Sequence, residues 1–374
     1  MNVYIQKFVD YDVNKLRQYF DETFKTIGLG KKLEKVKKLL IKPNLLGAYI
    51  PEKAVTVHPA VLEALLIYLK RFQLDIIVGD SPGGTVSSDE VYRKTGVKQL
   101  CDKYDVKLVN FKKNGIIIKE RESIKFYITN FFEEVDAIID VSKYKTHSLM
   151  YYTGSVKNLY GLIPGLKKSD YHKEFQTHIE FSKVIYNLYG IVKDKILINI
   201  QDGILGMEGE GPSSGIPRNF GLIFISESSS ALDYIASKML GFNLKQLPYI
   251  EKALEIDNIK TEDISIEKRW QNFTFDHVKI KKVSTIIKIL DYTPTVIKNV
   301  VRNLFDYYPD FNDRCKKCFV CVKSCPVNAM KLEKGMLHPE IDREKCIKCM
   351  CCHEFCPYDA IFVHKSFLAK LLIK

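Results

Sequence analysis

The chain has 374 residues, of which 46% are hydrophobic, and a formal net charge of +12. That length is enough for two or three folding units, and no run of about 18 uncharged apolar residues exists to span a membrane. The lysines lie in scattered pairs such as Lys31–Lys32, with no long basic block, so we expect no nucleic-acid partner. The first residues, Met1–Phe8, lack the form of a signal peptide, which favours a cytoplasmic protein.

An α/β fold is predicted for residues 1–282, because short apolar runs alternate with helical patterns along this part of the chain. Connections of this kind favour a mostly parallel sheet with flanking helices. Residues 115–128 have the pattern of a β-hairpin. Strands are predicted at residues 3–5, 39–41, 75–79, 107–111, 136–141, 196–200 and 221–226, and helices at residues 13–27, 59–71, 88–95, 179–192 and 231–240.

Four of the predicted strands run into polar or glycine-rich segments. In a parallel sheet, ligands collect beyond the carboxyl ends of the strands, so these segments predict a ligand site. Their lysines and amides supply positive charge and hydrogen-bond donors, which suit a small anionic ligand such as a phosphate or carboxylate. The residues concerned are Lys42 and Asn44, then Asp80, Ser81 and Gly83, then Lys145 and His147 with the nearby Lys157 and Asn158, and finally Asp202, Glu208, Gly209 and Gly211.

Three of these residues are candidates for a catalytic role. His147 can move a proton near neutral pH, and Lys145 and Asp202 are a cation and a carboxylate that would lie near it if the strand ends meet. Ordinary structure is the alternative, with a basic loop facing solvent at residues 143–147 and a mobile surface loop at residues 202–212. The second segment matches neither of the nucleotide-binding glycine patterns.

Residues 283–311 are predicted to form a linker. After Pro294, the apolar residues from Val296 to Tyr308 fall on one helical face, which indicates an amphipathic helix packed on the larger domain. A helix lying on a membrane is the alternative, although the flanking charges are few and mixed. The apolar tail Phe367–Lys374 is likewise predicted to pack on the larger domain, with a membrane surface as the alternative.

Residues 312–374 contain the most informative pattern in the chain, two copies of the spacing C-x2-C-x2-C-x3-C-P. This is the bacterial spacing for a pair of [4Fe–4S] clusters, in which three cysteines of one copy bind one cluster and the fourth binds the other. We therefore predict two clusters with crossed ligands. The first is assigned Cys315, Cys318, Cys321 and Cys356, and the second Cys346, Cys349, Cys352 and Cys325.

Three other uses of these cysteines compete with this prediction. Disulfides suit exported proteins, and so tight a spacing suits metal better. Structural zinc uses four ligands per site, which leaves the third cysteine of each copy unexplained. The string from Cys349 to His353 also matches the C-x-x-C-H of covalent haem attachment, but the longer pattern already uses both of its cysteines. Cys351, a ninth cysteine of the region, is expected to be a free thiol beside the second cluster.

The motifs at the strand ends resemble those of a known family, the domain of unknown function 362. The resemblance covers about residues 1–280, and residues 312–364 resemble a bacterial two-cluster ferredoxin, which members of this family often carry at the carboxyl end. It implies the architecture and the site, and no particular substrate. The matching segments are Lys42-Pro43-Asn44, Gly79-Asp80-Ser81-Pro82-Gly83, Lys145-Thr146-His147 with Lys157-Asn158, and Asp202-Gly203 with Glu208-Gly209-Glu210-Gly211-Pro212.

These patterns predict an iron–sulfur electron-transfer protein whose clusters pass electrons to or from a ligand or a partner protein bound by the α/β domain. An oxidoreductase is one form of this function. The alternatives are a non-catalytic ferredoxin whose large domain docks on a partner, and a protein that stores or delivers clusters or senses redox state. Exposed clusters would favour the low-oxygen cytoplasm of an anaerobe.

Overall fold

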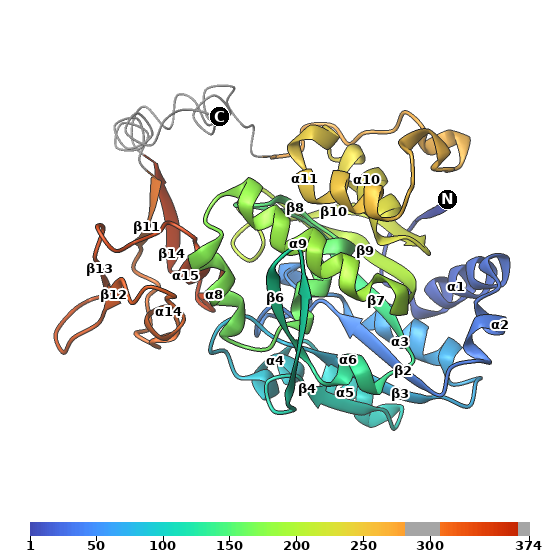
Figure 1. Ribbon diagram of the computed structural model, residues 1–374, viewed down its shortest axis with the longest axis horizontal. Helices are drawn as coiled ribbons and strands as arrows, with labels where there is room; N and C mark the ends of the chain where they lie inside the picture. The colour runs from blue at the N-terminus through green and yellow to red at the C-terminus, as the bar shows by residue number, and fades with distance from the viewer. Residues whose placement is uncertain (281–306, 366–374) are drawn as a thin grey trace.

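The computed structural model describes residues 1–280 and 307–365. At its centre lies a sheet with the strand order β1-β10-β9-β7-β2-β3-β4, and the short β8 pairs with β7 (Figure 1). Strands β9, β7, β2, β3 and β4 are parallel neighbours, whereas β10 and β8 pair antiparallel. The predicted α/β class with a mostly parallel sheet is therefore confirmed. The strands are β1 (Val3–Lys7), β2 (Lys38–Pro43), β3 (Asp75–Asp80), β4 (Lys107–Asn110), β7 (Ala137–His147), β8 (Tyr151–Thr153), β9 (Ile196–Glu208) and β10 (Ile216–Ser226).

Helices cover both faces of this sheet and create two apolar cores. Alternation along β2 shows the division, because Leu39 and Ile41 enter one core while Leu40 enters the other. The first core is covered by α1 (Val13–Ile27), α2 (Leu29–Leu33), α3 (Pro59–Leu69), α4 (Ser88–Lys94) and α5 (Val97–Lys103). The second is covered by the hairpin β5 (Ile116–Arg121) and β6 (Ile124–Thr129), and by α6 (Phe131–Glu134), α7 (Ser155–Asn158), α8 (Lys167–Glu174), α9 (His178–Val192), α10 (Ser229–Met239) and α11 (Pro248–Ile256).

Helix boundaries in the first half follow local signals in the sequence. The Asp12 side chain accepts hydrogen bonds from the first backbone N–H groups of α1, and Gly28 ends that helix with φ of 72°. Pro59 begins α3, where its missing N–H costs no helical hydrogen bond. Single-turn 3₁₀ segments lie at Pro51–Lys53, Leu159–Leu162, Lys193–Lys195, Leu244–Gln246, Thr261–Asp263 and Lys268–Trp270.

Two strands extend well beyond their predicted ends. Residues 143–147, for which a solvent-facing loop was the alternative to a ligand site, form the buried end of β7, and β9 continues past its predicted end at residue 200 as far as Glu208. Polar residues can occupy these buried strands because they neutralise one another, as where Lys143 Nζ lies 2.7 Å from Asp202 Oδ2. Local polarity alone therefore placed the strand ends too early.

The small domain shows an internal repeat with an offset of 31 residues. Positive φ values recur at Lys317 and Lys348, and again at Phe319 and Met350, directly before the short helices α14 and α15. Each copy thus folds its cysteine loop in the same way. The elements are β11 (Tyr307–Phe311) paired with β14 (Ile361–Lys365), β12 (Met330–Lys331) paired with β13 (Glu340–Ile341), α14 (Val320–Lys323) and α15 (Cys351–Phe355).

The small domain packs directly on the large one, beside α8 (Figure 1). Tyr49 donates its hydroxyl proton to the carbonyl of Cys356 at 2.7 Å, and Thr85 N donates to Ser324 Oγ at 3.2 Å. A Cβ at Gly83 would lie 2.2 Å from the Phe355 ring, so this glycine permits the close approach.

The predicted linker falls only partly within the described residues. Residues 307–311 form strand β11, whereas the predicted amphipathic helix up to residue 306 and the tail Phe367–Lys374 lie outside the described part. Within residues 1–280 and 307–365, no helix combines the length and the apolar character needed to cross a bilayer.

Candidate functional site

A cavity of about 70 Å³ lies at the carboxyl ends of β2, β3 and β7, and α15 of the small domain forms part of its wall. Lys42 and His147 stand behind this lining, in contact with Asp80 and Glu354. The structure therefore brings most of the predicted ligand residues to one place. Those that line the cavity are Asn44, Asp80, Ser81, Gly83, Lys145, Lys157 and Asn158.

A chain of short polar contacts joins the strand ends. Lys42 Nζ lies 2.9 Å from Asp80 Oδ1, and both side chains are almost completely buried. Asp80 Oδ2 also accepts a hydrogen bond from Leu45 N at 2.8 Å. Asn44 Nδ2 donates to Asn158 Oδ1 at 3.1 Å, which links the loop after β2 to α7. These contacts fix the floor of the cavity.

The end of β7 supplies the next two residues. Side chains alternate along a strand, so Lys145 and His147 point to the same face. Lys145 Nζ donates to Asn44 Oδ1 at 3.0 Å and to the carbonyl of Val55 at 2.7 Å. Burial lowers the pKa of Lys145 well below its usual value, because the protein interior disfavours the charged form.

The small domain adds a carboxylate to this site. Glu354 Oε1 lies 3.2 Å from His147 Nε2, and both side chains are buried. His147 Nδ1 accepts hydrogen bonds from the backbone N–H groups of Leu149 and Met150, so a neutral ring carries its proton on Nε2, toward Glu354. The contact is not aligned as a hydrogen bond, and neither atom has a hydrogen-bond partner in the described residues.

Burial and the nearby Lys157 determine the charges of His147 and Glu354. Burial lowers the pKa of His147 to about 4, so its ring is neutral at pH 7. For Glu354, burial alone would raise the pKa, but the attraction of His147 and Lys157 outweighs it and holds the pKa below its usual range. Because His147 is neutral at pH 7, we assign this stabilisation of the carboxylate chiefly to Lys157.

Two lysines bring positive charge to the cavity. Lys157, on α7, is only partly buried, lines the cavity, and has no hydrogen bond or ion pair in the part of the chain that is described. Its enclosure by protein lowers its pKa. Lys168, on α8, donates to the carbonyl of Ser81, and burial lowers its pKa to about 7. Poorly compensated cations in such an enclosure favour an anion.

Asp202 does not belong to this cavity, contrary to its predicted role near His147. It pairs with Lys143 and accepts hydrogen bonds from Tyr11 OH at 2.8 Å and from His58 N at 2.9 Å. Lys143 and Asp202 are fully buried, and burial lowers the pKa of Lys143. The geometry is that of an internal ion pair that ties β7 to β9 and to the start of α3.

Glu208, Gly209 and Gly211 are also absent from the cavity lining. Glu208 Oε2 lies 2.8 Å from Arg218 Nη1, and the Gly209 N–H donates to the carbonyl of Lys279 at 2.7 Å. A Cβ at Gly211 would lie 2.1 Å from a backbone oxygen of β7, so this glycine permits close packing of the chain. These backbone groups serve the fold and do not face a ligand in the cavity.

The site residues that sequence reasoning missed include Lys168, His172 and Glu354. Lys168 and His172 lie four residues apart in α8 and thus share one helical face, a signal that could have been read. Glu354 occupies the position that Lys323 holds in the first cysteine copy, 31 residues earlier. Comparing the two copies would have singled out this exchange of a lysine for a glutamate.

The cysteines gather in the small domain. One cavity is lined by Cys315, Cys318 and Cys321 together with Cys356 of the other copy. Burial raises the pKa of Cys352 well above its usual value, and the nearby sulfurs of Cys349, Cys346, Cys321 and Cys325 raise it further.

Backbone N–H groups approach the fourth cysteine of each copy, since Ala329 N donates to Cys325 Sγ at 3.2 Å and Ala360 N to Cys356 Sγ at 3.3 Å. Thiolates with such donors suit an iron–sulfur cluster. In the described residues, no group of three or more His, Cys, Asp or Glu side chains is arranged to hold a single metal ion.

Comparisons with known proteins support this division of the chain. The family model described as "Domain of unknown function (DUF362)" matches residues 39–238, and the model of a "4Fe-4S dicluster domain" matches residues 314–360. Both resemblances read from the motifs are confirmed. The carboxyl-terminal part therefore has the character of an iron–sulfur electron-transfer domain that binds a 4Fe–4S cluster.

Similar proteins include a curated relative and several solved structures. The thylakoid-associated protein sll1697 of Synechocystis sp. is 27% identical over 223 residues, which is 59% of this chain and 68% of that protein. The lactate racemase apoprotein of Thermoanaerobacterium thermosaccharolyticum gives a TM-score of 0.42 at 13% identity, covering 63% of this chain and 57% of its own. A protein from Thermotoga maritima gives a TM-score of 0.38 at 18% identity, and the match covers 68% of this chain and 60% of that protein. The chain spans less than two thirds of either of these two structures.

Proposed function

We propose that this chain, which belongs to the family described as domain of unknown function DUF362, is an electron-transfer protein that binds a small anion in the strand-end cavity and exchanges electrons with it. The small domain would hold two [4Fe–4S] clusters through the two crossed groups of cysteines. When bound, such clusters supply one-electron transfer. The α/β domain supplies the ligand site.

One observation carries this proposal: part of the cavity wall and Cys352, one cysteine of the second group, belong to the same short helix. Glu354 and Phe355 line the cavity, and Cys352 lies two residues before Glu354 in α15. Phe355 also packs with Cys349 and Leu46, and Leu46 belongs to the cavity lining as well. A ligand in the cavity would therefore lie against the residues that hold the second cluster.

The chain's own residues have distinct tasks in this proposal. The Lys157 ammonium, which has no hydrogen bond or ion pair in the described residues, binds the anion. Asn44 and Asn158 fix the floor through their mutual hydrogen bond. Lys168 Nζ, with a pKa lowered to about 7, can hold or release a proton near neutral pH. The docked small domain excludes bulk water from the site.

The other group of cysteines reaches the surface of the small domain at one of its members. Cys318 is exposed, and the neighbouring Lys316 and Lys317 are exposed as well. A redox partner protein could reach this side of the small domain without entering the cavity. The proposed electron path thus begins at Cys318, on the solvent-facing side of the small domain, and ends at the cavity. The protein would work in an oxygen-poor cytoplasm.

The clusters are tested by analysis of protein purified without oxygen. We expect about eight irons and eight sulfides per chain, as two such cysteine sets require. Cys325→Ser should remove about half of both, because it takes one ligand from the second group only. One or two zinc ions without labile sulfide would contradict the proposal.

The anion site is tested by the replacement Lys157→Met, which keeps the length of the side chain and removes its charge. Formate, acetate and phosphate should raise the melting temperature of the wild-type protein and lose this effect in the variant. Lys183→Met, at an exposed position of α9, is the matched control. Equal stabilisation of all three proteins would place the anion elsewhere.

A second candidate function follows from Glu354 itself. The chain already supplies a carboxylate to the cavity, so the α/β domain could serve only as a socket that anchors its ferredoxin-like domain. Glu354→Gln separates the two functions. If the cavity binds external anions, loss of the resident charge should strengthen acetate binding. If it is a socket, the variant should melt at a lower temperature and added anions should not restore it.

A further inference from the structure

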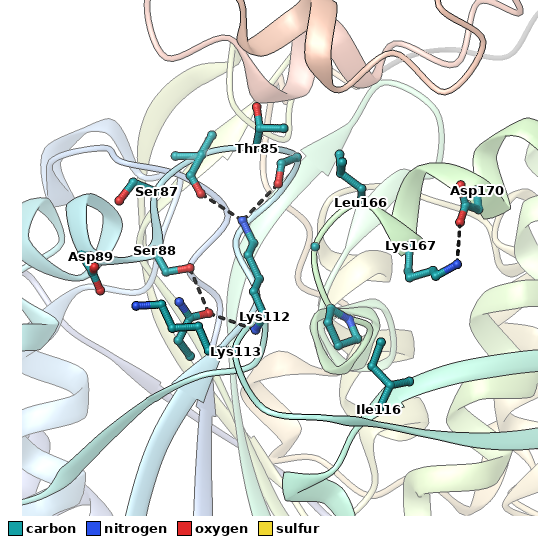
Figure 2. A pocket seen from close by; sticks show the side chains of 15 residues that line it. Thr85, Ser87, Ser88, Asp89, Lys112, Lys113, Ile116, Leu166, Lys167 and Asp170 are labelled. Atoms are coloured by element: carbon teal, nitrogen blue, oxygen red, sulfur yellow. Dashed lines mark hydrogen bonds and ion pairs between the residues drawn. The ribbon is translucent and has the colours of Figure 1, made fainter.

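A second cavity of about 660 Å³ opens to solvent beside the first (Figure 2). One wall is the segment from Gly84 to Asp89, which follows β3, and the other is the segment from Pro164 to Asp170, at the start of α8. Figure 2 shows Lys112 between these walls, where its Nζ donates to the carbonyls of Gly84 and Val86. We call this cavity the outer cleft and the smaller one the inner cavity.

The outer cleft and the inner cavity are separated by a thin partition. Ser81 and Gly83 line the inner cavity, and the next residue, Gly84, lines the outer cleft. On the opposite wall, Lys168 lines the inner cavity and its neighbour Lys167 lines the outer cleft. Two contacts close the gap, since Gly165 N donates to Ser81 Oγ at 2.8 Å and Lys168 Nζ donates to the carbonyl of Ser81.

The volumes of the inner cavity and the outer cleft indicate which part of a ligand each could hold. A cavity of about 150 Å³ can bind benzene, so the inner cavity, at about half that volume (about 70 Å³), has room for a head group of a few heavy atoms. The outer cleft, at about 660 Å³, is within the range of about 300–1,000 Å³ that holds small organic ligands. A molecule with a small charged head and a larger body would fill both.

The outer cleft has apolar surface that solvent reaches. Ile116 and Leu166 line it and are 45% and 46% exposed, although both are large aliphatic residues. The Lys112 ammonium is hydrogen-bonded to two backbone carbonyls, so its aliphatic stem is the part that forms the floor of the cleft. The exposed Ile116 and Leu166 therefore offer binding surface for the apolar body of a ligand.

We propose that the outer cleft binds the apolar chain of an extended carboxylate whose head group occupies the inner cavity beside Lys157. This inference rests on the proposed anion site and adds the class of its ligand. The chain packs against Leu166 and Ile116, and the head group reaches the inner cavity when the hydrogen bonds of Ser81 with Gly165 and Lys168 open. The substrate class is a straight-chain carboxylate longer than acetate.

The experiment measures binding of acetate, butyrate, hexanoate and octanoate to the full-length protein purified without oxygen, by titration calorimetry. Affinity should rise by about two- to fourfold for each methylene that becomes buried. Leu166→Ser and Ile116→Ser should flatten this dependence on chain length while leaving acetate binding unchanged. Both residues are solvent-exposed, so these variants should fold.

Ile118→Ser is the matched control, since Ile118 lies on the same strand, is 60% exposed and does not line the outer cleft. Octanol, which lacks the carboxylate, should not bind. If acetate binds and depends on Lys157 but longer chains bind no better, the inference is overturned and the anion site stands. A dependence on chain length that Leu166→Ser leaves intact also overturns it. If no carboxylate binds, both the anion site and this inference fail.

Discussion

Replacing Asp202 with asparagine tests whether this residue stabilises the fold or acts at the site. Its carboxylate accepts hydrogen bonds from Lys143 Nζ at 2.7 Å, Tyr11 OH at 2.8 Å and His58 N at 2.9 Å. Asparagine keeps one acceptor oxygen and has an NH2 group in place of the other. This NH2 group would face the N–H or O–H donors from which the carboxylate now accepts hydrogen bonds. Lys143, which is fully buried, then loses its counter-charge. Breaking a buried pair in this way costs about 3–5 kcal/mol.

The assays are urea unfolding and thermal melting, both monitored by far-ultraviolet circular dichroism on protein purified without oxygen. For a domain of this size, a loss of about 1 kcal/mol lowers the melting temperature by roughly 2–4 °C, so Asp202→Asn should melt on the order of 10 °C lower. The double variant Lys143→Met with Asp202→Leu should recover only part of the loss, because it leaves no buried charge but takes the acceptor from the Tyr11 hydroxyl and the His58 N–H. Anion binding by the folded protein should not change in either variant.

The reasoning would be refuted by the opposite pattern. If Asp202→Asn unfolds at the wild-type urea concentration and loses anion-induced stabilisation, Asp202 is part of the ligand site. The polar strand end would then have the functional role that its position in the sequence suggests.

Three further predictions concern the site and its closure. Gly83→Ala should destabilise the protein by about 1–3 kcal/mol, since its Cβ would lie 2.2 Å from the Phe355 ring, and adding Phe355→Leu should restore the urea midpoint. Burial lowers the pKa of His147 and of His172 to about 4, so the unfolded chain takes up protons below about pH 6.5 while the folded chain does not. Stability should therefore fall as the pH drops from about 6.5 toward 4, and His172→Phe, which can keep the stack on Phe181, should reduce the slope of the urea midpoint against pH. Cys351→Ser should keep the full iron and sulfide content, because both groups of four cysteines remain complete; loss of iron would make Cys351 a ligand.

Some features of the protein follow from the sequence alone, because their cause is local. Asp12, Gly28 and Pro59 act on the backbone within a few residues, so the limits of α1 and the start of α3 could be predicted. The cysteine spacing is equally local, since three thiols must come from one tight loop. The alternation of strands and helices was enough to predict the parallel sheet, whose carboxyl edge is where such folds bind ligands.

Other features depend on contacts between distant segments and could only be found in the tertiary structure. Asp202 and Lys145 look alike in the sequence, as polar residues beyond an apolar run, yet Asp202 meets Lys143 and Tyr11 while Lys145 meets Asn44. Which polar residue is neutralised and which is left to face a cavity depends on the register of β7 against β9 and on the path of the loops.

The docking of the small domain is the clearest example. Its approach requires the open backbone at Gly83, the ring of Phe355 and the carboxylate of Glu354, which come from segments about 270 residues apart. No periodicity or spacing encodes that meeting, because it arises from the complementary shape and charge of two surfaces that form only after each domain has folded.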